Sequence, residues 1–99
     1  MVFLRAKGYR ILRHRYKCKQ GEVDIICEKR HAVVFIEVKY RSTLDQALFA
    51  VDKQKYNRIQ KVALHFIKTN PQYHNCNLRV DIVAIGRFFS ISHQKNVIL

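Results

Sequence analysis

Acidic residues are scarce in this chain, and its first twenty positions contain none. Asp and Glu number 7 among 99 residues, against 19 Lys and Arg, so the net charge is +12 at pH 7. Seven of the basic residues lie in those first twenty positions: Arg5, Lys7, Arg10, Arg13, Arg15, Lys17 and Lys19. A field of this strength indicates a polyanionic partner, and we expect nucleic acid, with DNA in preference to RNA. A basic surface that only keeps the chain in solution is the open alternative.

Long apolar runs and paired cysteines are also missing. No apolar run approaches the roughly 18 residues of a membrane span, and the apolar start of the chain is too short for a signal peptide. Cys18, Cys27 and Cys76 are odd in number and form no C-x-x-C pair, which argues against a disulfide framework and indicates a reducing compartment. His74 lies close to Cys76, but no second ligand pair exists at useful spacing for zinc. We expect a cytoplasmic protein without contact to a membrane.

What the chain does contain is the composition of a globular domain. Hydrophobic residues make up 48% and aromatic residues 11% of the sequence, and we find no internal repeat, linker or low-complexity segment. A chain of this length makes one domain, which buries roughly 60 to 70% of its unfolded surface. We therefore predict a single α/β domain over residues 1–99, with a mixed, mainly antiparallel sheet.

The predicted elements follow from hydrophobic periodicity and from the residues that start and stop helices. A short helix over 2–7 ends at Gly8, and an edge strand with a basic outer face follows over 9–16. The stretch 21–39 reads as two apolar strand runs joined by a polar turn, with Cys27 buried in the first of them. This order predicts a helix followed by three strands.

The second half of the chain predicts a helix and one or two further strands. A helical turn over 42–51 is capped by Ser42 and Asp45, and Asp52 caps a helix over 53–68. A right-handed crossover sets the strand over 78–85 parallel to the third strand, and a last strand covers 88–93. The buried stripe of the helix comprises Tyr56, Ile59, Ala63, Phe66 and Ile67, and its basic face comprises Arg58, Lys61, His65 and Lys68. The exposed edge of the last strand needs cover from a partner or from the tail.

The register of the central hairpin follows from its turn. A two-residue turn at Arg30 and His31, or a four-residue loop over 29–32, makes the numbers of paired residues sum to 61. That register sets Asp24 opposite Glu37, Glu22 opposite Lys39 and Ile26 opposite Phe35. Two carboxylates about 5 Å apart repel unless a cation lies between them. A hard divalent ion, Mg²⁺ or Mn²⁺, fits this arrangement and normally binds together with substrate phosphates.

The acidic positions also resemble a known pattern. Asp24, a gap of twelve residues and then Glu37-Val38-Lys39 resemble the D…(D/E)-x-K signature of the PD-(D/E)XK nuclease superfamily. The similarity is closer to the small bacterial YraN-like proteins, which have a nuclease-like fold. Five blocks carry it in order: G-Y-R-I-L at 8–12, G-E-V-D-I-I at 21–26, V-F-I-E-V-K-Y-R at 34–41, the helix start at 50–58 and R-V-D-I-V-A-I at 79–85.

The resemblance implies an α-β-β-β-α-β restriction-endonuclease-like core and a magnesium-dependent endonuclease. Asp24, Glu37 and the Val38 carbonyl would hold the metal, and Lys39 would orient or activate water. Nucleases of the superfamily often place a helix Gln or Lys beside the metal, a role that would fall to Gln54 or Lys55. Glu22 is either a supporting acid or the ion-pair partner of Lys39, and Asp81 is expected to pair with a nearby Arg. Members of the family usually begin with a longer helix carrying a Gly-Glu pair, so the first helix here reads as truncated.

Nucleic acid is predicted to contact a set of basic side chains on the first strand, the third strand's end and the main helix: Arg10, Arg13, Arg15, Arg41, Lys55, Arg58 and Lys61. Two alternatives to catalysis stay open. The same fold could bind nucleic acid without cleaving it, or serve as a basic structural protein within a ribonucleoprotein. A homodimer is also compatible with the free strand edge.

Overall fold

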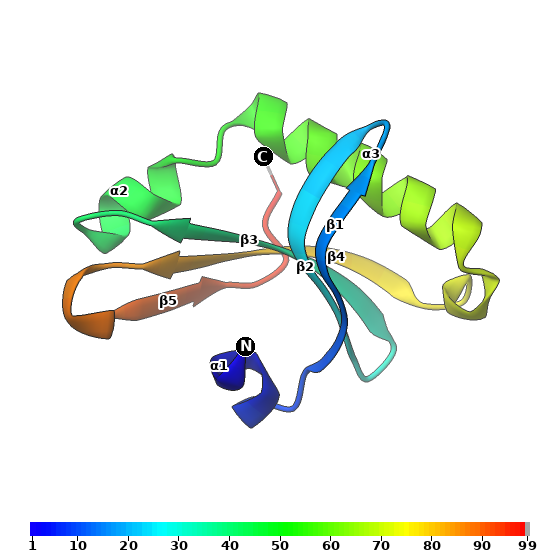
Figure 1. Ribbon diagram of the computed structural model, residues 1–99, viewed down its shortest axis with the longest axis horizontal. Coiled ribbons are helices and arrows are strands. Elements are labelled where there is room, and N and C mark those ends of the chain that lie inside the picture. The colour runs from blue at the N-terminus through cyan, green and yellow to red at the C-terminus, as the bar shows by residue number, and fades with distance from the viewer. Residues whose placement is uncertain (99) are drawn as a thin grey trace.

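A mixed sheet organises the protein, and the computed structural model describes it over residues 1–98 (Figure 1). Within that range the sheet has five strands in the order β1-β2-β3-β4-β5. The strands are β1 (Arg10–Cys18), β2 (Gly21–Lys29), β3 (Ala32–Tyr40), β4 (Asn77–Ile85) and β5 (Ile91–Gln94). The β3–β4 pair is parallel, and the other neighbours are antiparallel. The predicted α/β class with a mainly antiparallel sheet is confirmed.

The helices lie where the chain leaves and re-enters this sheet. They are α1 (Val2–Ala6), α2 (Leu44–Phe49) and α3 (Lys53–Thr69), with short 3-10 turns at Pro71–Tyr73 and Arg87–Phe89. Asp52 caps α3 as predicted, because its side chain accepts a 2.9 Å hydrogen bond from the Lys55 amide. Among residues 1–98, none of the helices has the length and apolar character that crossing a bilayer requires.

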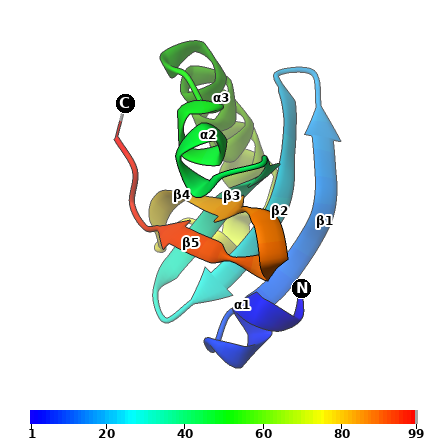
Figure 2. The same ribbon diagram turned by 90° about the vertical axis from the view of Figure 1, so that its left-hand side faces the viewer.

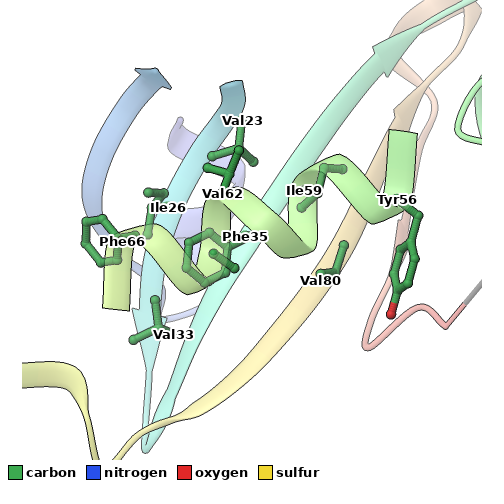
Figure 3. Packing of buried hydrophobic residues seen from close by; sticks show 10 residues of the cluster. Val23, Ile26, Val33, Phe35, Tyr56, Ile59, Val62, Phe66 and Val80 are labelled. Carbon is green, nitrogen blue, oxygen red and sulfur yellow. The ribbon is translucent and has the colours of Figure 1, made fainter. Parts of the chain in front are cut away.

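The α3 face of the sheet carries the larger part of the core. Figure 3 shows the helix lying across β2, β3 and β4, with Phe66 close to Phe35. The two rings meet edge to face at 5.9 Å between centroids, a favourable aromatic geometry. Val62 is fully buried in this layer, although the predicted stripe omitted it, and Ile67 is only partly buried. The predicted stripe is otherwise confirmed.

The opposite face of the sheet is covered by α1, which lies across the sheet from α3 (Figure 1). Leu4 of α1 is fully buried with Val34 and Ile36 of β3. Cys27 belongs to the same layer, where burial raises the pKa of its thiol to about 12. It is a buried apolar residue, as predicted.

The β1–β2 hairpin curls toward α3, and both Figure 1 and Figure 2 show its turn beside that helix. Gly21 follows the turn with φ of 140°, and a Cβ there would lie 3.6 Å from the side chain of Val62. Arg15 adopts a φ of 50° within β1, in a left-handed region that only glycine enters without strain. The curl therefore involves a strained residue in the middle of a strand.

Two predicted boundaries are wrong. The cap of α2 is Thr43, whose hydroxyl accepts a 3.1 Å hydrogen bond from the Gln46 amide, and not the Ser42 and Asp45 pair. The last strand begins at Ile91, because residues 87–89 form a 3-10 turn in which Phe88 has a φ of 56°. Beyond β5 the Val97 amide donates to the Val80 carbonyl at 2.8 Å, so the tail continues along β4.

Candidate functional site

The predicted acidic pair lies at a fork in the sheet. The β2–β3 ladder runs from Lys29 opposite Ala32 to Ile25 opposite Ile36, which confirms the register with a sum of 61. The ladder ends there, one residue before Asp24 and Glu37. In its place the Asp24 carboxylate accepts a hydrogen bond of 2.7 Å from the Val38 amide. A side chain thus satisfies the main-chain donor where the two strands separate.

Glu37 is the buried member of the pair. Its side chain is 3% exposed, on a strand whose neighbours Phe35 and Val33 belong to the α3 layer. Burial raises the pKa of Glu37, the adjacent Asp24 raises it further, and Lys55 acts in the opposite direction. Two carboxyls this close favour sharing a proton unless a cation compensates them.

Two lysines reach the same oxygen of Glu37 from different elements. Lys39 Nζ lies 3.3 Å and Lys55 Nζ lies 3.2 Å from Oε2. Lys39 is two residues further along β3 and shares its face, whereas Lys55 comes from the first turn of α3. Lys55 was predicted to contact nucleic acid and, with Gln54, was a candidate for a helix side chain beside the metal; its ion pair with Glu37 was not predicted. Its position in the first turn, three residues after the Asp52 cap, was the available signal, because that cap fixes the direction in which the helix starts.

The chemistry of the donor set fits a hard cation that brings its own water or phosphate ligands. The contacts with Val38, Lys39 and Lys55 involve Oδ2 of Asp24 and Oε2 of Glu37, and the two carboxyls also lie within hydrogen-bonding distance of each other. Carboxylate oxygens are the hard donors that Mg²⁺ or Mn²⁺ takes in proteins. Within residues 1–98, no group of three or more His, Cys, Asp or Glu side chains is close enough to hold a metal. A cation at Asp24 and Glu37 would therefore need oxygens from the main chain, water or substrate.

Glu22 does not join this cluster. It forms a 3.8 Å ion pair with Lys17 across the β1–β2 hairpin, and both side chains are exposed. The predicted placement of Glu22 beside Lys39 is wrong, because β2 and β3 have already separated at that point and Lys39 pairs with Glu37 instead. Glu22 is therefore a useful reference position, an acid on the same strand that lies outside the cluster.

Asp81 is the second buried acid, and it belongs to a separate polar cluster on the α1 face. Arg79 donates from Nε to Oδ1 at 3.1 Å and from Nη2 to Oδ2 at 2.7 Å, which confirms the predicted Arg partner. His93 Nε2 lies 2.7 Å from Oδ2, and the Asn96 amide donates to Oδ1 at 2.9 Å. Burial alone would raise the pKa of Asp81, but these hydrogen bonds lower it below its ordinary value. Both carboxylate oxygens of Asp81 thus have partners within its own cluster, and Asp81 does not belong to the candidate site.

Comparison with known proteins gives the family. The sequence model of a family described as "Uncharacterised protein family UPF0102" matches residues 1–85. The chain belongs to UPF0102. The match confirms the resemblance to the YraN-like proteins, while membership in the nuclease superfamily stays a prediction.

Relatives in UPF0102 share about two fifths of their aligned residues with this chain. The UPF0102 protein of Rhodopseudomonas palustris (strain BisA53) is 43% identical over 85 residues, which cover 86% of this chain and 65% of the relative. The UPF0102 protein bll0669 of Bradyrhizobium diazoefficiens is 40% identical, with 86% and 64% covered. The chain spans just under two thirds of the length of these relatives.

The UPF0102 match contains every residue of the acidic cluster and its two lysines. It ends at residue 85, so the 3-10 turn with Phe88, strand β5 and the tail lie outside it. The Asp81 cluster is thus divided, because Arg79 and Asp81 lie in the matched part while His93 and Asn96 do not. The cluster of Asp24, Glu37, Lys39 and Lys55 belongs to the part that UPF0102 shares.

The predicted basic contacts fall into three groups. Arg15 and Lys55 lie at the acidic cluster, and Arg10 is paired with Glu28. Arg13, Arg41, Arg58 and Lys61 are exposed. Arg13 leans over the Phe66 ring, with 5.6 Å between its guanidinium carbon and the ring centroid. Arg13 of β1 with Arg58 and Lys61 of α3 are called the exposed basic surface below, and Arg41 follows the end of β3.

Proposed function

We propose that this UPF0102 protein is a magnesium-dependent endonuclease that hydrolyses phosphodiester bonds in nucleic acid, DNA in preference to RNA. The observation that carries the proposal is the meeting of Asp24 with the buried Glu37 at the fork of β2 and β3, where Lys39 and Lys55 both reach Glu37. A buried carboxyl with a raised pKa beside a second carboxylate is a costly arrangement. Such arrangements are concentrated at functional sites.

Asp24 and Glu37 would hold the cation, with the Val38 carbonyl as a third protein ligand. Bound Mg²⁺ or Mn²⁺ would supply positive charge to the phosphate and make a coordinated water more acidic. The two lysines would position the water, the phosphate and Glu37. Lys39 presents an ammonium group beside Glu37, where it can orient the attacking water or donate to a phosphate oxygen. Lys55 fixes the Glu37 side chain from the start of α3.

The reaction is a hydrolysis with simple stoichiometry. The water oxygen forms a bond to phosphorus, the bond from phosphorus to one sugar oxygen breaks, and a proton from the water ends on that leaving oxygen. The products are a phosphomonoester and a free hydroxyl. The surrounding basic surface, at a net charge of +12, holds the polyanion without reading its sequence.

A binding module without catalysis is the second candidate, and one observation favours it. Glu37 already has two lysine partners at 3.2 and 3.3 Å, so the cluster can be compensated without a cation. In that case Asp24 and Glu37 only stabilise the fold, and nucleic acid is bound by charge and shape alone.

A cleavage assay separates the two candidates. Single-stranded, duplex and branched DNA, and RNA of the same sequences, are incubated with the protein with and without Mg²⁺ or Mn²⁺. We expect cation-dependent cleavage that Glu37→Ala abolishes and Glu22→Gln leaves intact. Cleavage that persists in Glu37→Ala, or no cleavage of any substrate with either ion, would overturn the proposal of catalysis.

A further inference from the structure

A pocket opens beside Asp24 on the face of the sheet opposite to α3. Its volume is about 290 Å³, and its lining includes His14 and Arg15 of β1, Asp24 of β2, and Val38 and Tyr40 of β3. Val38 and Ile25 face the α1 layer, whereas Glu37 faces α3. Asp24 lies between the two, because it lines the pocket and is also the neighbour of Glu37. The fork in the sheet therefore connects this pocket to the acidic cluster.

The strained residue of β1 is part of this pocket. The β1–β2 ladder pairs His14 with Ile25 and Tyr16 with Val23, so Arg15 stands across from Asp24. Its φ of 50° costs energy in any residue other than glycine, and such strain is concentrated at binding and catalytic sites. Arginine at this place brings a positive charge to the pocket wall. Within residues 1–98, Arg15 forms no ion pair that would neutralise it.

Tyr40 supplies an aromatic surface at the other side of the pocket. It ends β3 opposite Ile85, and it is 63% exposed. An exposed aromatic ring next to positive charge is the arrangement on which unpaired bases stack in single-strand-binding proteins. The pocket volume of about 290 Å³ lies just under the roughly 300 Å³ at which small-ligand sites begin, so we expect room for one nucleotide and not for a base pair.

We propose that this pocket receives one unpaired nucleotide of DNA, with its base on Tyr40 and its phosphate near Arg15 and His14. The inference rests on the proposed function, because it names the substrate feature that would bring a phosphate to Asp24. Bases that are already unpaired are favoured, since a paired base would first have to leave its stack. The preferred substrate is therefore a single strand, or a duplex that carries a bulge or a branch.

The test measures binding without cleavage. Fluorescence anisotropy in EDTA compares a DNA hairpin that carries one bulged thymidine with the same hairpin fully paired. We expect the wild-type protein to bind the bulged hairpin about tenfold tighter, a ratio in the range expected for one stacked base. Tyr40→Ala should reduce that ratio to about one, and Tyr40→Phe should retain it. Phe88→Ala removes an aromatic ring that is 95% exposed but outside the pocket lining, and it should leave the ratio unchanged.

A double-mutant cycle tests whether the effect depends on the base. Replacing the bulged thymidine by an abasic nucleotide removes the base and keeps the phosphate. The resulting loss of affinity should equal the loss caused by Tyr40→Ala, and the two changes together should lower the affinity no more than either alone. Additive losses, or a wild type that binds both hairpins equally, would overturn the pocket assignment. A bulged ribonucleotide that binds tighter than the deoxynucleotide would overturn the choice of DNA.

The outcomes also separate this inference from the proposed catalysis. A bulge preference that depends on Tyr40, in a protein that cleaves nothing with Mg²⁺ or Mn²⁺, would support the pocket and overturn the hydrolysis. Cleavage that depends on Glu37, without any preference for unpaired nucleotides, would support the hydrolysis and overturn the pocket. Arg15→Gly removes the charge and relieves the strain, so it should weaken binding of the bulged hairpin while raising the melting temperature.

Discussion

The Asp24 carboxylate accepts a 2.7 Å hydrogen bond from the Val38 amide, and this contact stands where the β2–β3 ladder stops. Asp24 therefore has a structural role, as the acceptor for the Val38 amide, in addition to its proposed role as a ligand of the cation. The same side chain touches the strand that carries Glu37 and lines the pocket on the other face. Substitutions at this position can separate the two tasks.

Asp24→Asn keeps an oxygen that can accept the Val38 hydrogen bond, whereas Asp24→Ala does not. We expect the free energy of unfolding of Asp24→Asn to lie within about 0.5 kcal/mol of the wild type. Asp24→Ala should lose about 1–3 kcal/mol, the cost of an unpaired amide. Both should abolish cleavage. Urea unfolding and the cleavage assay measure the two effects, and an Asp24→Asn protein that cleaves normally would remove Asp24 from the catalytic centre.

Glu37→Gln should stabilise the protein at neutral pH. The pKa of Glu37 is raised by burial and by Asp24, so the folded state holds this proton more tightly than the unfolded chain does. The stabilisation is complete below the ordinary value of about 4.5 and is lost as the pH rises through the folded pKa. Gln keeps the shape without the charge, so the variant should gain about 1 kcal/mol at pH 7.

Melting temperatures between pH 4 and pH 8 check this prediction. The difference between Glu37→Gln and the wild type should grow with pH and disappear near pH 4. Glu22→Gln, at an exposed acid of the same sheet, should show no comparable trend. A Glu37→Gln protein that is less stable at pH 7 would mean that the two lysines outweigh the burial of the carboxylate.

The register of the central hairpin could be predicted because it depends on local features. The two-residue turn at Arg30 and His31 and the alternation of apolar side chains fix the pairing of Ile26 with Phe35. The cap of α3 at Asp52 could be predicted for the same reason. The cap of α2 was predicted one residue too early, since the hydroxyls of Ser42 and Thr43 can both cap a helix and adjacent positions are hard to separate.

The remaining features depend on how distant segments meet. Val62 is buried because the β1–β2 hairpin curls onto a second flank of α3, near Gly21, and nothing in the helix sequence signals that contact. The separation of Glu22 from Lys39 has the same origin, because it begins where the two hairpin strands diverge. Phe88 reads as a strand residue by propensity, but its left-handed backbone forms a turn.

The Asp81 cluster should govern stability in mild acid. Burial lowers the pKa of His93. The positive charges of Lys7 and Lys95 lower the pKa of His93 further, and Asp81 acts in the opposite direction. Lys7 Nζ lies 2.6 Å from Nδ1 of the same ring. Because the folded state disfavours the imidazolium, stability should fall as the pH drops below about 6.5, where the unfolded chain takes up the proton.

Thermal unfolding between pH 8 and pH 5 measures this loss. His93→Gln should reduce the dependence of the melting temperature on pH relative to the wild type, and His65→Gln, on the α3 surface, should not. Asp81→Ala leaves Arg79 without its buried partner and should cost about 3–5 kcal/mol at every pH above 5. An unchanged pH profile in His93→Gln would contradict this assignment.

The exposed basic surface should make binding strongly dependent on salt and weakly dependent on sequence. Replacing Arg58 and Lys61 by Gln should reduce the slope of log K against log salt by about one unit for each lost phosphate contact. A double variant at Arg30 and Arg87 removes the same charge from positions outside the predicted contacts and should change the slope less. Equal effects of the two double variants would show that net charge alone determines binding.

Lys39 and Glu37 should have separable effects on cation binding and turnover. Two carboxyls and a carbonyl are few ligands, so Mn²⁺ should bind weakly alone and more tightly with hydrolysis-resistant phosphorothioate DNA. Glu37→Ala removes a ligand and should abolish Mn²⁺ binding. Lys39→Ala removes a positive charge 3.3 Å from Glu37, so Mn²⁺ binding should persist or strengthen while cleavage falls by about 10² to 10³.

Calorimetric Mn²⁺ titration of the wild type, the two variants and Glu22→Ala decides between a metal site and a closed ion cluster. Glu22→Ala should bind Mn²⁺ like the wild type, because Glu22 pairs with Lys17 outside the cluster. DNA affinity in EDTA should survive all three substitutions, since the exposed basic surface lies elsewhere. A wild type that takes up no Mn²⁺, with or without DNA, would mean that Lys39 and Lys55 already complete the charge balance of Glu37 and that the protein binds nucleic acid without cleaving it.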